Sequence, residues 1–268
     1  MPSKIEWLHR SGTSPETWNF IGGCTKVSDG CRNCYACRLA ATRLKHHPMY
    51  RGTAEMLHPR MHWRYSHPQW TGRVRWDRTR SAIPMHWRKP RTIFVCSTSD
   101  LFHPAIPPDV VQAAYSVMSV CRQHTFIIVT KRPERIVPVL YKKGMGYFGG
   151  GDYLPNVWHL VTAENQPAAD ERIPELFKLR EASPGWPVLG VSVEPMLEAL
   201  NFLSLPESGA ELDWVICGAE TGPNARPMKL KWARDLHVQC KQAGVPFFMK
   251  KVSKGQRIPD DLMVREFP

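Results

Sequence analysis

Short apolar runs rich in Val, Ile and Phe recur along this 268-residue chain and constrain its fold more than any other feature. Such runs are typical of strands that are buried on both faces of a parallel sheet. With "TWNFIGG" (17–23) as a first strand, the runs give roughly seven strand-helix units. The other six are "RTIFVCS" (91–97), "TFIIVTK" (125–131), "NVWHLVT" (156–162), "PVLGVSV" (187–193), "DWVICG" (213–218) and "VPFFMK" (245–250).

Helix-like stretches lie between these runs, at 107–123, 169–182 and 229–244. Prolines introduce the first stretch and Gly244 closes the last, which are start and stop signals of helices. Alternating strands and helices predict a parallel α/β barrel, incomplete if seven units are all it has, in a single domain over residues 1–268. A doubly wound open sheet is the alternative, because one sequence does not reveal the strand order.

The chain is long enough to bury a full core without covalent staples. Its start, "MPSKIEWLHR", lacks the apolar stretch of a signal peptide, and no run approaches the roughly 18 apolar residues of a membrane span. We therefore expect a cytoplasmic protein with no membrane contact. In a reducing compartment, clustered cysteines are metal ligands or redox groups more often than disulfides.

A basic segment holds most of the net charge of +12. Between Arg43 and Arg91 stand twelve basic residues against only Glu55 and Asp77. We interpret residues 46–90 as a basic insertion after the first helix, and its arginines and tryptophans fit a nucleic-acid groove, with DNA favoured. The alternative is a solvated basic surface with the tryptophans packed on the core. The tryptophans are Trp63, Trp70, Trp76 and Trp87.

Charged residues stand directly after the apolar runs. The carboxyl ends of parallel strands converge on one face, where active sites of α/β folds lie. Six charged strand ends in succession therefore predict a site on that face. They are Asp100, Lys131, Glu164, Glu194, Glu220 and Lys250.

Four cysteines lie within fourteen positions of "IGGCTKVSDGCRNCYACRLA" (21–40), namely Cys24, Cys31, Cys34 and Cys37. Zinc ribbons usually need two separated ligand pairs, and no second CxxC lies apart from this loop, although nearby histidines leave a Cys/His zinc site open. A compact glycine-containing loop at a barrel mouth better suits a [4Fe-4S] cluster, where three thiolates leave one iron free to bind something else. Cys37 is either a packed thiol or a fourth ligand. The histidines are His46, His47, His58 and His62.

The stretch "TWNFIGGCTKVSDGCRNCYA" resembles the cysteine loop of radical S-adenosylmethionine (SAM) enzymes. Together with later blocks such as "RTIFVCSTSDLFH", "VSVEPML" and "DWVICGAETGPNARPM", the chain is similar over roughly 5–250 to a bacteriophage-associated family of unknown function. That family has a three-cysteine, radical-SAM-like core. The chain departs from the usual loop in a first gap of six residues in place of three, and in the additional Cys37.

The resemblance implies that Cys24, Cys31 and Cys34 hold a [4Fe-4S] cluster whose open iron chelates SAM. One electron from an external donor would then cleave SAM to methionine and a 5′-deoxyadenosyl radical, which abstracts hydrogen from carbon. It also assigns SAM contacts to Tyr35, Ser97, Ser99, Asp100, Gly218 and Glu220. The remaining strand-end residues are expected to contact the substrate and to take part in catalysis. They are Lys131, Glu164, Glu194 and Lys250.

Two functions from different classes follow. The first is a radical SAM enzyme that modifies or repairs a nucleic-acid base, in the host cytoplasm if a phage encodes it. The second is a non-catalytic nucleic-acid-binding protein that carries zinc or an iron-sulfur cluster. The strand-end carboxylates favour the enzyme, because a binder of phosphates has little use for them. A radical enzyme with a small-molecule substrate is a third option.

Overall fold

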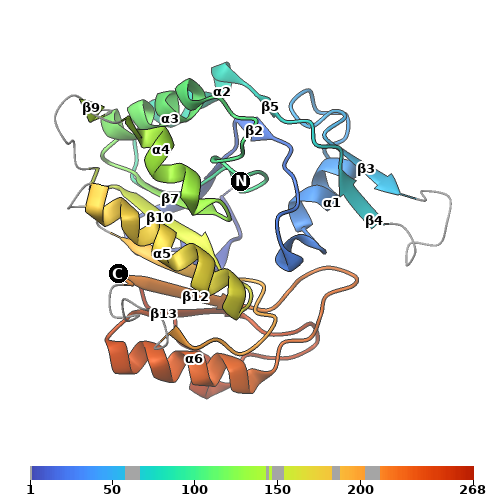
Figure 1. The fold of residues 1–268 in the computed structure, drawn as a ribbon, viewed down its shortest axis with the longest axis vertical. Helices are drawn as coiled ribbons and strands as arrows, with labels where there is room; N and C mark the ends of the chain where they lie inside the picture. The colour runs from blue at the N-terminus through green and yellow to red at the C-terminus, as the bar shows by residue number, and fades with distance from the viewer. Residues whose placement is uncertain (1, 58–66, 143–144, 147–153, 183–187, 203–211) are drawn as a thin grey trace.

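Seven parallel strands form the central sheet of the computed structural model (Figure 1), which describes residues 2–57, 67–142, 145–146, 154–182, 188–202 and 212–268. Their spatial order is the order of the sequence, which is the order of a barrel and not of a doubly wound sheet. The sheet curls into a half-barrel with β1 and β13 at its edges, as expected for an incomplete α/β barrel. The strands are β1 (Ser14–Trp18), β6 (Arg91–Val95), β7 (Thr125–Thr130), β10 (Val157–Thr162), β11 (Leu189–Val193), β12 (Trp214–Gly218) and β13 (Phe247–Lys251).

Helices cover the convex face of the half-barrel (Figure 1). Side chains alternate along each strand, so that Phe126 and Ile128 of β7 enter the core between sheet and helices. Tyr115 of the covering helix α3 is fully buried in the same core. The helices of this layer are α3 (Pro108–Val120), α4 (Ile136–Leu140), α5 (Gln166–Ala182) and α6 (Leu230–Ala243).

The concave face has its own aromatic core. Ile127 of β7 faces this side, together with Trp158 and Trp214 from β10 and β12. The turn η1 (Glu6–Leu8) lies against β1, β6 and β13, and its Trp7 ring centroid is 4.9 Å from that of Phe94. The N-terminal segment therefore fills the space that a closed barrel would give to its own strands.

The first strand differs from its predicted range of 17–23. β1 ends at Trp18, and β2 (Ile21–Gly22) leaves the sheet to pair with β5 (Arg75–Trp76) in antiparallel fashion. Gly22 has no room for a side chain, because a Cβ there would be 2.4 Å from the carbonyl oxygen of Met49. The glycines that end the predicted strand thus serve the close approach of another segment.

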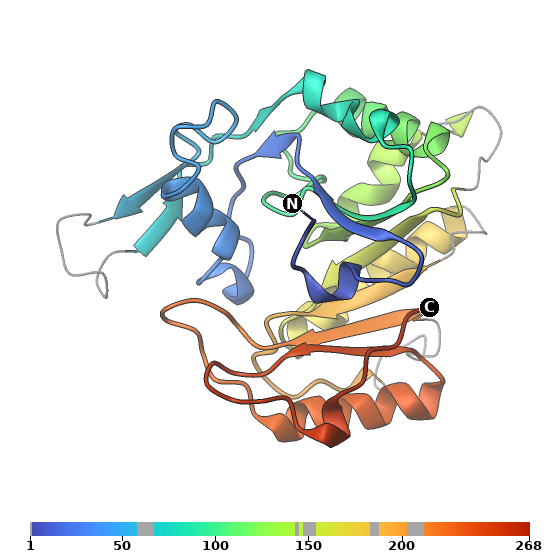
Figure 2. The same ribbon diagram turned by 180° about the vertical axis from the view of Figure 1, so that it is seen from behind.

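The first part of the predicted insertion forms, with α1 (Tyr35–Ala41), a small lobe beside the half-barrel (Figures 1 and 2), whereas residues 78–86 of its second part contact α3. The hairpin of the lobe, β3 (Ala54–Leu57) and β4 (His67–Trp70), packs on α1. Residues 58–66, which include Trp63, His58 and His62, lie outside the described residues. The remaining elements are η2 (Asp29–Cys31), α2 (Arg78–Ser81), η3 (Ile83–His86), η4 (Pro133–Arg135), β8 (Tyr141–Lys142), β9 (Met145–Gly146) and η7 (Asp260–Leu262).

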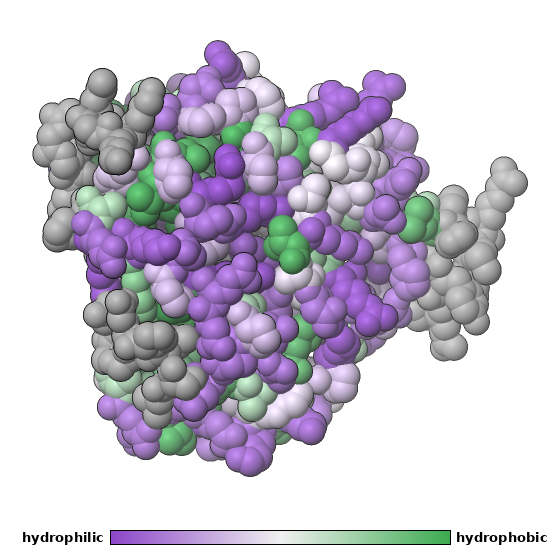
Figure 3. All heavy atoms as spheres, viewed as in Figure 1, coloured by the Kyte–Doolittle hydropathy of each residue, from purple (hydrophilic) through white to green (hydrophobic). Residues whose placement is uncertain are grey.

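The surface is hydrophilic on the face drawn in Figure 3, with apolar side chains scattered singly or in small groups. None of the described helices is long and apolar enough to cross a membrane, in agreement with the sequence.

Candidate active site

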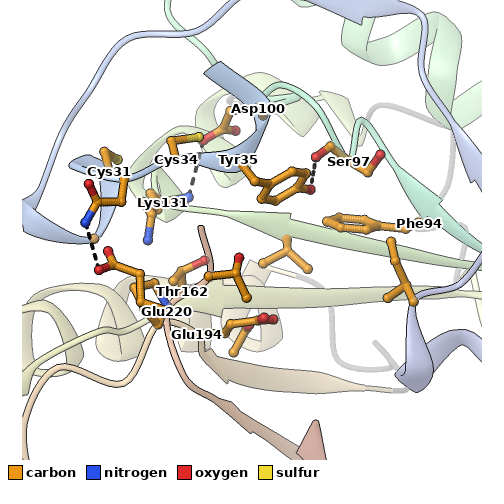
Figure 4. A pocket seen from close by; sticks show the side chains of 18 of the residues that line it. Cys31, Cys34, Tyr35, Phe94, Ser97, Asp100, Lys131, Thr162, Glu194 and Glu220 are labelled. Carbon is orange, nitrogen blue, oxygen red and sulfur yellow. Dashed lines mark hydrogen bonds between the residues drawn. The ribbon is translucent and has the colours of Figure 1, made fainter. Parts of the chain in front are cut away.

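A cavity of about 560 Å³ lies at the carboxyl ends of the strands (Figure 4). That volume is typical of sites for small-molecule ligands. The cysteine loop forms one wall, and strand ends form the other. The cavity brings together eleven of the thirteen predicted site residues: Cys24, Cys31, Cys34, Tyr35, Ser97, Ser99, Asp100, Lys131, Glu194, Glu220 and Lys250.

Gly218 and Glu164 are the two predicted residues that do not line the cavity. A Cβ on Gly218 would be 3.3 Å from Cγ of Glu194, so the missing side chain makes room for that glutamate. Glu164 is fully buried behind the wall, where it forms ion pairs. Glu164 therefore supports the wall from behind, and Gly218 leaves space for Glu194.

The three cysteines of the predicted cluster differ from the chain's other five. Cys24, Cys31 and Cys34 are partly exposed on the cavity wall, whereas the rest are buried. Cys37 is 1% exposed and packs among residues of α1 and the lobe. Burial, with a contribution from Asp100, raises the pKa of Cys24 to about 12. A thiolate at this position thus needs a neighbouring positive charge, such as a metal ion provides.

Within the described ranges, no three His, Cys, Asp or Glu side chains lie close enough together to hold a single metal ion. The three cavity cysteines therefore share a wall without converging on one point. His46 and His47 do not complete a zinc site with them.

Backbone and side-chain contacts from two strand ends hold the cysteine loop. The Gly30 N–H donates to Glu164 Oε1 at 3.2 Å, and a Cβ on Gly30 would be 2.8 Å from Cδ of that glutamate. Asn33 Nδ2 donates to Glu220 Oε2 at 2.9 Å. Arg226, which also binds Glu220, donates to the Asp29 carboxylate at 3.0 Å. The loop is thus tied to the segments that follow β10 and β12.

Arg132 forms a third tie, which sequence reasoning missed. Its buried guanidinium donates to Asp100 Oδ2 at 2.8 Å, to the Thr25 carbonyl at 3.0 Å and to Cys24 Sγ at 3.8 Å. The only signal in the sequence is its position directly after Lys131, at the end of a strand.

The Asp100 carboxylate accepts four hydrogen bonds from the described part of the chain. Its Oδ1 accepts from the Phe102 N–H at 3.0 Å and from Thr130 Oγ1 at 2.8 Å. Its Oδ2 accepts from the Lys131 N–H at 3.3 Å and from Arg132. A ligand amine would have to share these oxygens, so Asp100 mainly positions the end of β7 and Arg132.

The end of β6 makes an unusual turn at Cys96, whose φ of 55° lies in the left-handed region. Such strain in a non-glycine residue is often found at functional sites. The turn places Ser97 so that its carbonyl accepts a hydrogen bond from the Tyr35 hydroxyl. Figure 4 shows the Tyr35 ring reaching from the cysteine loop toward Ser97. The ring therefore lies between the two walls.

Each remaining acidic strand end is shared by two cations. Lys131 Nζ and Arg172 lie 3.1 and 3.0 Å from Glu164 Oε2. Burial alone would raise the pKa of Glu164, but these two cations outweigh it and lower the pKa to about 2. Lys250 and Lys251 lie 2.7 and 3.2 Å from the Glu194 carboxylate.

The tryptophans of the basic segment do not share one environment. Trp70 is buried beside α1 and lines the cavity. Trp87 packs on the main core, with the Arg91 guanidinium 4.7 Å from its ring. Trp76 is 38% exposed. Of the three described tryptophans, Trp76 therefore remains the candidate for stacking on a base, and Trp70 and Trp87 follow the alternative of packed side chains.

Comparison with known protein families matches residues 2–264 to a family described as "Protein of unknown function (DUF5131)". No curated protein and no solved structure matches the chain. The match covers the half-barrel, the lobe and every residue of the cavity. The chain therefore belongs to the DUF5131 family of proteins of unknown function.

Proposed function

We propose that this protein is a radical SAM enzyme whose [4Fe-4S] cluster is held by Cys24, Cys31 and Cys34. The observation that carries the proposal is the selective placement of these cysteines. Of eight cysteines, these three line the strand-end cavity and five are buried elsewhere. Zinc or a structural cluster would need no cavity of ligand size next to the thiols.

The donor set fits such a cluster. Its irons take thiolate ligands, and a cluster of four irons and four sulfides keeps those ligands at separate corners. The three thiols, which lie on one wall of the cavity but do not meet at a single point, match this need for separate corners. When bound, a three-thiolate cluster supplies the electron that cleaves SAM into methionine and a hydrogen-abstracting 5′-deoxyadenosyl radical.

The chain's own residues orient the ligands and exclude water. Trp7, Phe94 and Val129 make one part of the cavity apolar, which protects a reactive species from solvent. Tyr35 offers an aromatic face for a purine base beside the cysteine loop. Arg132 and Glu164 hold that loop through Thr25 and the Gly30 N–H, so the thiols keep their places relative to the strand ends.

For the substrate we propose a nucleic-acid base, taken from a single strand or flipped out of a duplex. The support is the exposed basic surface formed by Arg73, Arg75 and Trp76, of which the last two make up β5 and pair with β2. These residues adjoin the cysteine loop, because Gly23 packs against the Arg73 backbone. An external electron donor, the association with bacteriophage and the cytoplasmic location remain predictions from the sequence.

The proposal is tested by metal and sulfide analysis of protein purified without oxygen. We expect about four irons and four sulfides per chain, and a change in the electron paramagnetic resonance spectrum of the reduced protein when SAM is added. Dithionite and SAM should yield 5′-deoxyadenosine slowly without substrate. Cys31→Ala should lose the iron, while the matched change Cys37→Ala should keep it. Stoichiometric zinc without sulfide would overturn the proposal.

A further inference from the structure

Two groups of charged side chains at the cavity, one on its wall and one partly behind it, contain more cations than carboxylates. In the Glu194 cluster, the Nζ atoms of Lys250 and Lys251 lie 2.7 and 3.2 Å from the carboxylate oxygens of Glu194. In the Glu164 cluster, Lys131 Nζ and the Arg172 guanidinium lie 3.1 and 3.0 Å from Oε2 of Glu164. All three lysines line the same cavity.

Both glutamates are ionised at neutral pH. Burial raises the pKa of Glu194, but Lys250 and Lys251 outweigh it, so the pKa lies below its ordinary value. The pKa of Glu164 is about 2 for the same reason. Each cluster therefore keeps one positive charge in excess. Two other acids of the wall already have arginine partners: Asp100 pairs with Arg132, and Glu220 with Arg226.

The excess charge is held where water is scarce. The side chains of Lys250 and Lys131 are 13% and 17% exposed, and that of Lys251 is 29% exposed. A cation that is removed from bulk water is unfavourable unless an anion compensates it. An ammonium group is a compact charge with three donors, which suits the oxygens of a phosphate or a carboxylate.

We infer that the substrate carries an oxyanion, either a phosphate or a carboxylate, that binds Lys250 and Lys251 in this cavity. Glu194, which also lines the cavity, is paired with both lysines and orients them. Figure 4 shows Glu194 and Cys34 on opposite sides of the cavity, so a substrate anchored at the lysines extends toward the cysteine loop. The inference rests on the proposed function only in naming the anion-bearing ligand as the substrate.

Thermal unfolding in phosphate, acetate and chloride at equal ionic strength tests the inference. A bound anion stabilises the fold with a saturating concentration dependence, whereas ion exclusion from the surface does not saturate. We expect phosphate or acetate to stabilise the wild type with a saturating concentration dependence. Which of the two anions does so shows whether the site prefers a phosphate or a carboxylate. Lys250→Gln and Lys251→Gln should abolish the saturating part. The control Lys254→Gln changes an exposed lysine outside the cavity and should retain it.

Three results would overturn the inference. The first is the absence of saturating stabilisation in the wild type, and the second is an equal response in all four proteins. The third is loss of the response when SAM is added, which would assign the site to the carboxylate of the cofactor. Because the salts are compared within each variant, a general loss of stability caused by the substitution does not affect the comparison. Cys31→Ala, which should lack iron, should keep the anion response, so failure of the cluster and failure of the anion site are distinguishable.

Discussion

The buried carboxylate of Glu164 provides the sharpest test of how the site is built. Glu164→Gln keeps the shape of the side chain but leaves Lys131 and Arg172 without their shared negative charge. The cations lower the pKa of this fully buried group from 4.5 to about 2. At about 1.4 kcal/mol per pH unit, the charged form stabilises the fold by on the order of 3 kcal/mol. Losing one member of a buried ion pair costs a similar amount, roughly 3–5 kcal/mol.

Urea unfolding followed by tryptophan fluorescence measures this loss. With a denaturant slope near 3 kcal/mol per molar, the midpoint of Glu164→Gln should fall by about 1 M at neutral pH. Because the folded pKa is the lower one, the contribution is complete above about pH 4.5 and disappears as the pH falls toward 2. The difference between wild type and variant should therefore narrow in acid.

The matched control is Glu171→Gln, an exposed glutamate on the same helix as Arg172. Its effect should stay within about 0.5 kcal/mol at every pH. Equal midpoints for Glu164→Gln and wild type at neutral pH would refute the buried ion network. A difference that persists undiminished at pH 3 would show that packing, and not charge, causes the loss.

Three further changes probe the loop, the surroundings of the proposed cluster ligand Cys24, and the basic segment. Gly30→Ala should cost roughly 1–3 kcal/mol in the same urea assay, since its Cβ would be 2.8 Å from Cδ of Glu164, and it should be less damaging in a Glu164→Ala background, which removes the contacting atoms, if the contact is the cause. Arg132→Lys should lower the reduction potential of the cluster-loaded protein, read by potentiometric titration at unchanged iron content, because a hydrogen bond to Cys24 Sγ is weakened. Trp76→Ala should weaken binding of single-stranded oligonucleotides by about 1–3 kcal/mol in fluorescence titrations, whereas the packed Trp87→Ala should change stability and leave affinity per folded molecule alone.

The sheet was predictable because its strands are buried on both faces. Six apolar runs each coincide with one observed strand, although β13 continues one residue past its run, and most of their charged ends line one cavity. The first strand was misplaced because Ile21 and Gly22 look like its continuation, although their partner is a short strand more than fifty residues later. Local periodicity carries no information about which distant segments pair with each other.

The packing of the N-terminal segment inside the half-barrel was equally difficult to predict from the sequence. Trp7 stands in a short polar stretch that carries no strand or helix signal, yet its ring packs against Phe94 and Trp214. Those contacts exist only once the sheet has curled. The arginine partners were missed for the same reason, since Arg172 lies on a helix and nothing in its sequence context points to Glu164. Sequence reasoning therefore found many residues that line the cavity but not the pairs they form.

Those pairs explain why the strand ends carry so many charges. The cysteine loop has little regular structure, and ordering each of its residues costs on the order of 1–2 kcal/mol of conformational entropy. Charged hydrogen bonds from three strand ends, through Arg132, Glu164 and Glu220, offset part of that cost. Most acids of the cavity wall are thus committed to holding the loop or a neighbouring cation. The lysines that remain in excess are the groups best placed to meet a ligand, which is why the substrate of this cavity should be anionic.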